Sequence, residues 1–176
     1  MQSIDIALFT LINAGAGTPR WAIQSAIFIS DVLPALAVGV FALAAVAQPA
    51  WRKPLLAALV SVLLAWALVR LFRSVVHVPR PAALGLGTQW TSQGPRPGFP
   101  SMHVTTSFAF AITVLFARLR GPGVAFLLLA LLVGWSRVFL GLHFPSDVCA
   151  GAMLGALLGA VVHFARRGRP LRPSSS

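Results

Sequence analysis

One histidine and one aspartate near the C-terminus have the types and the spacing of a nucleophilic site. His143 and Asp147 lie four residues apart, so on a helix that begins near residue 144 the carboxylate reaches back to the imidazole ring. That carboxylate would fix the tautomer of the ring and stabilise the imidazolium that forms when the ring attacks phosphorus. His103, on a different segment, can give a proton to the leaving oxygen near neutral pH. We therefore predict that His143 is the nucleophile, Asp147 its orienting partner and His103 the general acid.

Basic side chains that suit a phosphate accompany these residues. They are Arg73, Arg80 and Arg137. The planar guanidinium group offers two parallel N–H donors to the oxygens of a phosphate. Pro100-Ser101 and Pro145-Ser146 are each typical of a helix start, with Ser101 as an N-cap, and the free N–H groups of a helix start bind anions. We expect two helix N-termini and three arginines to surround one dianionic group.

A metal site is not expected. The acidic residues of the chain are Asp5, Asp31 and Asp147, and the one cysteine is Cys149. Mg²⁺ and Ca²⁺ need several carboxylate or carbonyl oxygens, and one cysteine excludes a cysteine cage for zinc. The sequence predicts a site without metal and without a cofactor, in which arginines neutralise the phosphate.

The elements that position these residues must be membrane helices. Of the 176 residues, 57% are hydrophobic and 10% are charged, whereas a soluble domain has about 25% charged residues. Long apolar runs without alternation favour helices over a β-barrel. The net charge of +11 does not indicate nucleic acid here, because the arginines flank apolar runs and would anchor them among lipid headgroups. We predict an all-α, polytopic membrane helix bundle whose partners are membrane lipids.

The apolar runs predict about five transmembrane helices after an N-terminal interfacial or re-entrant helix at residues 4–14. The five runs cover residues 21–46, 55–72, 103–116, 124–140 and 146–165. A short basic loop is expected at residues 51–53 and a tight turn at residues 118–122. Residues 1–165 would form a single membrane domain, followed by a basic, disordered tail at residues 166–176. Residues 73–102 are the longest polar stretch, and residues 82–99 are a candidate lid.

The distribution of basic residues predicts an orientation. Apart from the three site arginines, most arginines and lysines lie near residues 52–53, 118–120 and 166–172. The positive-inside rule then puts the C-terminus in the cytoplasm and the site on the outer, periplasmic face. The last apolar run also carries Gly151, Gly155 and Gly159 at a spacing of four, which is typical of close packing within a bundle or between the subunits of a homo-oligomer.

Three motifs carry a resemblance to a known family. They are Arg73-x6-Arg80-Pro81, Pro100-Ser101-x-His103 and Ser136-Arg137-x5-His143-x3-Asp147. Together they resemble the three-part signature of the type 2 phosphatidic acid phosphatase superfamily. The resemblance implies a metal-independent phosphatase with a phosphohistidine intermediate. It assigns His143, Asp147 and His103 the roles predicted above, and it implies that Arg73, Arg80, Ser101 and Arg137 bind phosphate.

Two positions depart from this signature. The first basic residue is usually lysine and is Arg73 here, which keeps the charge but replaces a point charge by a fork. The usual glycine between Ser101 and His103 is Met102, which we expect to contribute its backbone N–H to the phosphate. In addition, residues 8–21 (LFTLINAGAGTPRW) are similar to the N-terminal stretch of undecaprenyl-diphosphate phosphatases of the bacitracin-resistance type.

Four polar residues have two interpretations each. An intramembrane carboxylate such as Asp31 indicates function by default, but it can also be the partner of a buried arginine. His77 is either a loop residue or part of the site. Arg70 is an interfacial anchor or a headgroup ligand, and Arg96 is a loop residue or a ligand of a second phosphate.

The function that these predictions support is hydrolysis of undecaprenyl diphosphate to undecaprenyl phosphate in the bacterial cytoplasmic membrane, which recycles a lipid carrier for cell-wall synthesis. One alternative is another lipid substrate, such as phosphatidylglycerol phosphate, phosphatidic acid or lipid A. An alternative of another class is a carrier that binds lipid headgroups without catalysis. Such a carrier would need the arginines but not the His143–Asp147 pair.

Overall fold

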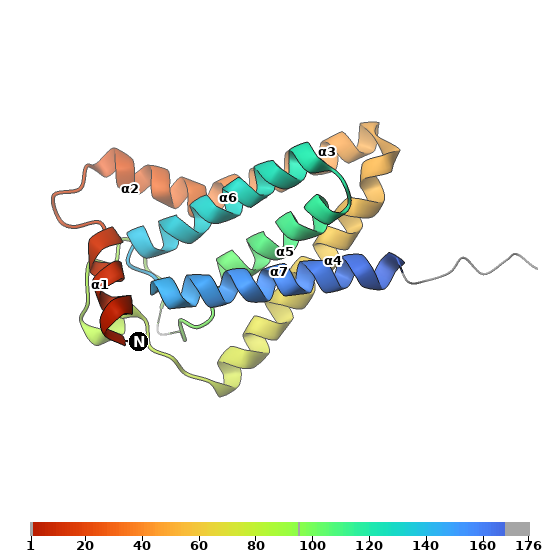
Figure 1. Ribbon diagram of the computed structural model, residues 1–176. Helices are drawn as coiled ribbons and strands as arrows, with labels where there is room; N and C mark the ends of the chain where they lie inside the picture. Colours follow the sequence, from red (N-terminus) through yellow and green to blue (C-terminus); the bar gives the residue numbers. More distant parts are fainter. Residues whose placement is uncertain (1, 95, 168–176) are drawn as a thin grey trace, which may run out of the picture.

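The protein is a helix bundle, as the composition predicts. The computed structural model describes residues 2–94 and 96–167, which form helices and loops without a β-strand (Figure 1). The α-helices are α1 (Gln2–Ile12), α2 (Arg20–Ile27), α3 (Leu33–Ala47), α4 (Pro49–Val75), α5 (Met102–Phe116), α6 (Arg120–Phe139) and α7 (Pro145–Arg167). A π-helical turn, η1 (Phe28–Val32), joins α2 to α3, and a 3₁₀ turn, η2 (Pro81–Leu84), lies in the loop that follows α4.

Four apolar segments are long enough to cross a membrane. They are Arg20–Ala47, which combines α2, η1 and α3, then Pro49–Val75, Arg120–Phe139 and Pro145–Arg166. The remaining predicted span, at residues 103–116, corresponds to α5, whose 15 residues extend about 22 Å at 1.5 Å per residue. Many large apolar side chains, such as Leu43 and Leu63, are exposed on the outer helices, where only lipid can solvate them. The chain is a multi-pass membrane protein.

The helix boundaries differ from the predicted ones where basic residues lie near a membrane surface. The predicted basic loop at residues 51–53 is wrong, because α4 begins at Pro49 and includes Arg52 and Lys53 in its first turns. The Arg52 guanidinium reaches back and donates to the Ala45 carbonyl at 3.1 Å, at the end of α3. Likewise α7 continues through Arg167, two residues into the predicted tail, and the remaining tail residues lie outside the described part of the chain.

Helix α5 lies at the centre of the bundle and packs against α4, α6 and α7. The three glycines at a spacing of four make the contact between α5 and α7 close. A Cβ atom on Gly155 would lie 2.3 Å from the Thr105 carbonyl oxygen, and one on Gly159 would lie 2.7 Å from the Ala109 carbonyl oxygen. The glycine face is therefore used inside the bundle, which is one of the two alternatives that its spacing predicted.

Hydrogen bonds hold the long loop between α4 and α5 against the residues that directly follow α1. The Asn13 side chain accepts a hydrogen bond from Thr88 N–H at 2.7 Å and donates to the carbonyls of Thr88 and Phe139, each at 3.0 Å. The Trp90 indole donates to the Ala14 carbonyl at 2.9 Å. Residues 86–90, which fall in the candidate lid, are thus held against α1 and the end of α6.

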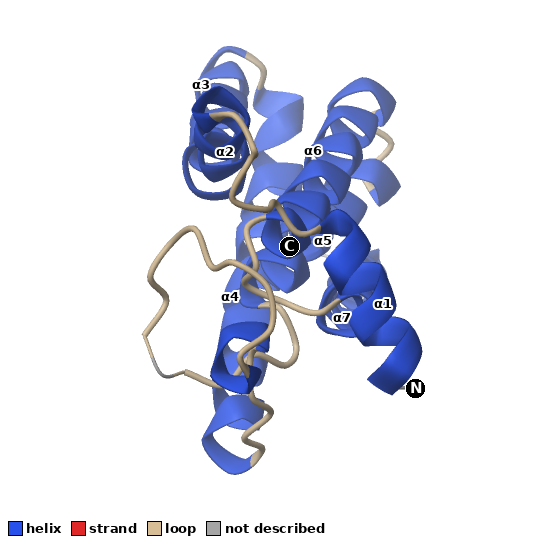
Figure 2. Ribbon diagram, turned by 90° about the vertical axis from the view of Figure 1, so that its left-hand side faces the viewer, coloured by secondary structure: helices blue, strands red, loops and turns tan. Residues whose placement is uncertain are grey.

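The two ends of the bundle differ in the segments that connect the helices there (Figure 1). One end carries the short turns between α3 and α4 and between α5 and α6, together with the end of α7. The other end carries α1, the loop between α4 and α5, and the short link between α6 and α7. Figure 2 shows this second end, where the loops gather around the start of α5. The predicted site residues lie at this end.

Candidate active site

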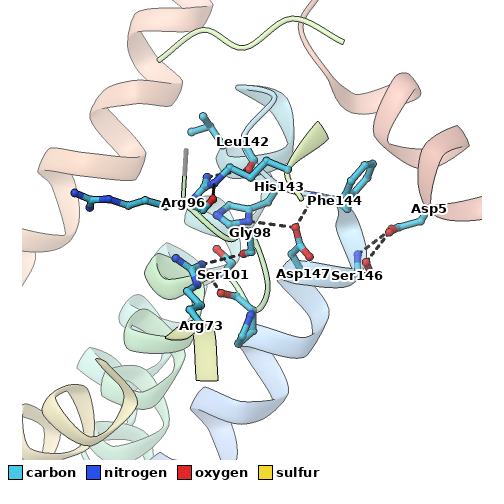
Figure 3. Close-up of polar contacts among 12 residues, drawn as sticks. Asp5, Arg73, Arg96, Gly98, Ser101, Leu142, His143, Phe144, Ser146 and Asp147 are labelled. Carbon is cyan, nitrogen blue, oxygen red and sulfur yellow. Dashed lines mark hydrogen bonds and ion pairs between the residues drawn. The ribbon is translucent and has the colours of Figure 1, made fainter. Parts of the chain in front are cut away.

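The link between α6 and α7 buries the predicted nucleophile beside its predicted partner. His143 and Asp147 are each 1% exposed, and His143 Nδ1 lies 3.2 Å from Asp147 Oδ2 (Figure 3). The spacing of four residues works because α7 begins at Pro145, as the sequence predicts. Asp147 Oδ2 also accepts the Phe144 N–H at 3.0 Å. A carboxylate at Nδ1 holds the ring proton there and leaves the lone pair on Nε2.

The surroundings of His143 favour its neutral form. Burial lowers the pKa of His143 well below 6.5, and the positive charges of Arg80, Arg137 and Arg73 lower it further. Desolvation and nearby cations both disfavour the imidazolium. The ring is therefore a free base at neutral pH, which is the state that a nucleophile needs.

Arg137, in the last turn of α6, is fully buried and only partly paired. Its Nη1 donates to Ser30 Oγ at 2.6 Å and to Asp31 Oδ1 at 3.1 Å. Its Nε and Nη2 are buried without a hydrogen-bond partner. Buried donors of a charged group are costly when unpaired, so this side of the guanidinium is ready for an anionic acceptor.

Arg73 and Arg80 each donate hydrogen bonds to backbone carbonyls of the surrounding loops, which the sequence did not predict. Arg73 Nη2 donates to the carbonyls of Gly98, at 2.9 Å, and of Pro100, whereas Arg73 Nε is buried without a partner. Arg80 Nε donates to the Arg96 carbonyl at 3.0 Å, and Arg80 Nη1 donates to the Leu142 carbonyl at 3.1 Å. Burial lowers the pKa of Arg80 from its ordinary value, and the nearby Asp147 charge opposes this shift. Both arginines thus hold the surrounding loops in place.

The start of α5 is open toward the site. Ser101 takes the N-cap position as predicted, but its side chain makes no capping hydrogen bond. Ser101 Oγ is fully buried and has no partner. The backbone N–H of Ser101 donates to the Asp147 carbonyl at 3.1 Å, which ties this helix start to α7. Met102 is the first residue of α5, so its N–H has no acceptor within the helix.

The backbone N–H groups at the start of α7 already have acceptors within the protein. The prediction that this helix start binds an anion is therefore wrong. Ser146 donates to Asp5 on α1 twice, from its N–H to Oδ1 at 2.9 Å and from its hydroxyl to Oδ2 (Figure 3). The next two N–H groups, of Asp147 and Val148, donate to the Phe144 carbonyl. Because Asp5 caps this helix from outside, one helix start remains for a phosphate, that of α5.

Asp31 is one of the four residues with two interpretations from the sequence, and the structure gives it two partners. Its Oδ1 accepts from Arg137 Nη1 and lies 3.7 Å from His103 Nε2. Asp31 is thus the partner of a buried arginine and also a neighbour of the predicted general acid. Its neighbour Ser30 is buried and was not predicted, because a serine in an apolar run carries no recognisable signal.

The remaining candidates lie at the edge of the site or outside it. His77 and Arg96 line a cavity of about 320 Å³ that shares Arg80 with the site. Arg70 lies over the Trp66 ring, 5.1 Å from its centroid, on the exposed face of α4, which agrees with an interfacial anchor. Among the described residues there is no group of three or more histidine, cysteine or acidic side chains close enough to hold a metal ion.

The site combines buried donors that have no hydrogen-bond partner with the buried base His143. Apart from Thr91 Oγ1, the buried side-chain atoms without a hydrogen-bond partner in the described structure are Arg73 Nε, Arg137 Nε, Arg137 Nη2 and Ser101 Oγ. They belong to α4, α5 and α6, which approach His143 at one end of the bundle. This arrangement can bind a tetrahedral anion and present it to the free Nε2 of His143.

Comparisons with known proteins agree with this chemistry. A model of the PAP2 superfamily matches residues 54–169. The chain is 32% identical over 162 residues to YbjG of Escherichia coli (strain K12), which is named as a candidate undecaprenyl-diphosphatase, and the match covers 89% of this chain and 80% of YbjG. It is 35% identical over 129 residues to the decaprenylphosphoryl-5-phosphoribose phosphatase of Mycobacterium tuberculosis (strain CDC 1551 / Oshkosh), covering 72% and 70% of the two chains.

The fold also has a solved counterpart. The crystal structure of a transmembrane PAP2-type phosphatidylglycerolphosphate phosphatase from Bacillus subtilis superimposes with a TM-score of 0.76. The match covers 97% of this chain and 89% of that chain at 23% sequence identity. At this identity the likeness shows the fold.

Proposed function

The chain belongs to the PAP2 superfamily and is a membrane lipid phosphatase, and from this premise we propose that it removes the terminal phosphate of undecaprenyl diphosphate. The observation that carries the phosphatase chemistry is the set of buried, unpaired donors of Arg73, Arg137 and Ser101, because the charges of both arginines also act on His143. The polyprenyl substrate is supported by the similarity to YbjG and by the N-terminal stretch that resembles undecaprenyl-diphosphate phosphatases.

In the proposed mechanism the terminal phosphate lies between Arg137, Arg73 and the start of α5. His143 Nε2 attacks phosphorus, the bond from phosphorus to the bridging oxygen breaks, and His103 gives its proton to that oxygen. Asp147 stabilises the imidazolium character that develops on His143. Water then attacks the phosphohistidine, His103 takes up a proton from this water, and inorganic phosphate leaves.

An apolar groove supports a lipid as the substrate. It has a volume of about 370 Å³, and α3, α4, α5 and α6 form its walls. Thr106 on its wall is one helical turn beyond His103, and Pro34 is three residues beyond Asp31, so the groove begins on the side of these two residues. We propose that the prenyl chain lies in this groove, which puts the leaving oxygen next to His103.

The test of this proposal is a substrate panel with the purified protein in detergent. We expect undecaprenyl diphosphate to have the highest kcat/KM among that lipid, phosphatidylglycerol phosphate, phosphatidic acid and lipid A. The His143→Ala variant should lose turnover completely, whereas His163→Ala, at the other end of the bundle, should keep it. A higher kcat/KM for another lipid would refute the substrate, and turnover by a folded His143→Ala variant would refute the mechanism.

A second candidate substrate is favoured by one comparison. The Mycobacterium tuberculosis relative is named for a phosphate on a polyprenyl-linked sugar. That substrate would place a sugar between the phosphate and the prenyl chain. Adding a decaprenylphosphoryl-5-phosphoribose 5-phosphate arm to the panel separates the two candidates by kcat/KM.

We also propose the orientation that the basic residues predict, with the site on the periplasmic face. The start of α4 and the end of α7 lie at the end of the bundle opposite to α1 and the loop between α4 and α5 (Figure 1). These two segments contain Arg52, Lys53 and Arg166, and the positive-inside rule puts them in the cytoplasm. A reporter fused to the C-terminus should be active as a cytoplasmic reporter. A periplasmic signal would reverse this orientation.

A further inference from the structure

Asp31 is an acidic residue in an apolar segment, and its position is unusual. It lies in the π-helical turn η1, and such single turns often occur at functional sites. A carboxylate within a membrane segment is costly unless it has a partner or a task. Its side chain is 37% exposed, so pairing with the buried Arg137 does not fully explain why a carboxylate lies at this position.

One oxygen of Asp31 lies next to both the Arg137 guanidinium and the His103 imidazole. Oδ1 accepts from Arg137 Nη1 at 3.1 Å and lies 3.7 Å from His103 Nε2. Ser30 Oγ accepts from the same Arg137 Nη1 at 2.6 Å. These two acceptors fix one edge of the guanidinium, so the unpaired Nε and Nη2 form the edge that is available to phosphate. Ser30 and Asp31 share this task, but Asp31 alone of the two also faces His103.

The charge of Asp31 matters to His103 because other nearby side chains are cations. Arg137, Arg73 and Arg80 would all disfavour an imidazolium at this place. A nearby carboxylate favours the charged imidazole, which is the form that has a proton to give. The apolar groove is lined by Pro34, three residues after Asp31, and by Thr106, three residues after His103.

We propose that Asp31 is a positioning residue for protonation of the leaving group. It favours the protonated form of His103 over the neutral one, directs the ring toward the bridging oxygen, and orients Arg137 for the phosphate. This inference rests on the phosphatase mechanism proposed above. When the P–O bond breaks and the N–P bond forms, one proton moves from His103 to the lipid oxygen, and Asp31 remains ionised. The same proton position is refilled when His103 takes a proton from the attacking water.

The test compares two substrates that share a tail and differ in their leaving group. One is a long-chain alkylphenyl phosphate, and the other is its nitro-substituted analogue, whose phenolate leaves without a proton. In the Asp31→Asn variant we expect kcat for the parent substrate to fall about 10- to 100-fold, which is a part of the roughly 10²- to 10⁴-fold that general-acid catalysis contributes, because His103 itself remains. We expect kcat for the nitro analogue to stay within about threefold of the wild-type value, because that leaving group needs no acid.

Ser30→Ala is the matched control, because it removes the other acceptor of Arg137 Nη1 and leaves His103 untouched. It should raise KM for both substrates by the same factor and leave their ratio of kcat values unchanged. His103→Ala should reproduce the selective loss of Asp31→Asn. Formation of the phosphohistidine from the nitro analogue, trapped by rapid quenching, reports the folded and reactive fraction of each variant.

Two results would overturn the proposal. An equal loss of kcat with both substrates would mean that Asp31 acts only through structure or through Arg137 and not on protonation of the leaving group. Unchanged kcat with both substrates would mean that it has no part in protonation. Failure of the phosphatase mechanism itself gives a different result, because then His143→Ala would still turn over the nitro analogue.

Discussion

The site contains two histidine–aspartate pairs that differ in their exposure to the surroundings. In the pair His143–Asp147 the side chains are 1% and 2% exposed and the contact is 3.2 Å, whereas in the pair His103–Asp31 they are 40% and 37% exposed and the contact is 3.7 Å. The same two residue types thus occur in a closed and in an open setting. Burial fixes the ring and keeps it neutral, while an open pair can exchange protons with water and with the substrate.

The difference in exposure explains how histidine can act as a nucleophile in one pair and as a general acid in the other. A nucleophile must be unprotonated and rigid, and the closed pair provides both conditions. A general acid must recover its proton in every turnover, which requires access to water. We therefore expect each pair to fail in its own way when its carboxylate is removed.

The largest expected effect comes from the closed pair. Asp147→Asn should lower kcat by about 10³- to 10⁴-fold, the scale seen when the carboxylate of a catalytic triad becomes an amide. The loss should be similar for the alkylphenyl phosphate and its nitro analogue, because both need attack by His143. Steady-state kinetics with the two substrates measure this.

The matched comparison is Asp31→Asn, which makes the same chemical change in the open pair. If Asp147→Asn spared the nitro analogue as Asp31→Asn is expected to do, the distinction between the two pairs would be wrong. Thermal unfolding of both variants in detergent checks that each is folded.

The second effect is a pH dependence that belongs to the closed pair. Burial and the charges of Arg80, Arg137 and Arg73 lower the pKa of His143 well below 6.5. The ring should therefore stay neutral as the pH falls past 6.5, and it should become protonated only when the pH falls through this lower pKa. The site should lose its nucleophile there, with kcat/KM falling about tenfold for each further pH unit.

The titration can be measured without substrate by ¹⁵N NMR of labelled histidine, with His143→Ala to assign the signal. Arg80→Gln removes the largest of the nearby charges that lower this pKa, so the His143 signal should titrate at a higher pH in this variant. A His143 signal that titrates at or above pH 6.5 in the wild-type protein would contradict the closed setting.

A smaller effect is expected from the residue that holds the closed pair from outside. Asp5→Ala removes both acceptors of Ser146 at the start of α7. Loss of an N-terminal cap lowers the free energy of unfolding by about 1 kcal/mol, so the melting temperature in detergent should fall by a few degrees.

Because Asp5 contacts neither histidine in the described structure, kcat of Asp5→Ala should stay within about threefold of the wild-type value. Asp5→Asn keeps one acceptor for the Ser146 N–H and should have a smaller effect on stability. A large loss of kcat with an unchanged melting temperature would show that α1 acts on the chemistry directly.

The sequence predicted the closed pair and missed the construction of the open one, for a physical reason. The spacing of His143 and Asp147 is local, and a helix that begins at Pro145 translates it directly into a contact. The contact between Asp31 and Arg137 joins residues 106 positions apart, and no periodicity encodes which helices become neighbours. The hydrogen bonds between Ser146 and Asp5 join residues 141 positions apart, and for the same reason the sequence could not predict that the start of α7 is already capped.

Fold class and helix order were predictable because apolar runs must become helices in lipid. Helix ends were less predictable, because Arg52 and Lys53 lie within α4 and their long side chains can extend to a membrane surface. The loop after α4 contains residues 82–99, which the sequence predicts as a candidate lid. Its attachment through Asn13 and Trp90 depends on α1 and α6, which the loop sequence does not contain.

Treatment with EDTA is expected to have no effect on activity. This experiment tests whether the two histidine–aspartate pairs orient the imidazole rings or bind a metal. Histidine and aspartate are also ligands for zinc, but a structural zinc site uses four such groups and a catalytic site three. In the described part of the chain each pair stands alone, and no third histidine, cysteine or acidic side chain joins it. We therefore expect kcat and KM to be the same before and after prolonged treatment with EDTA. A loss of activity that returns on addition of a divalent metal would mean that one pair binds a metal during catalysis, and then the difference between the pairs would reflect metal binding instead of proton access.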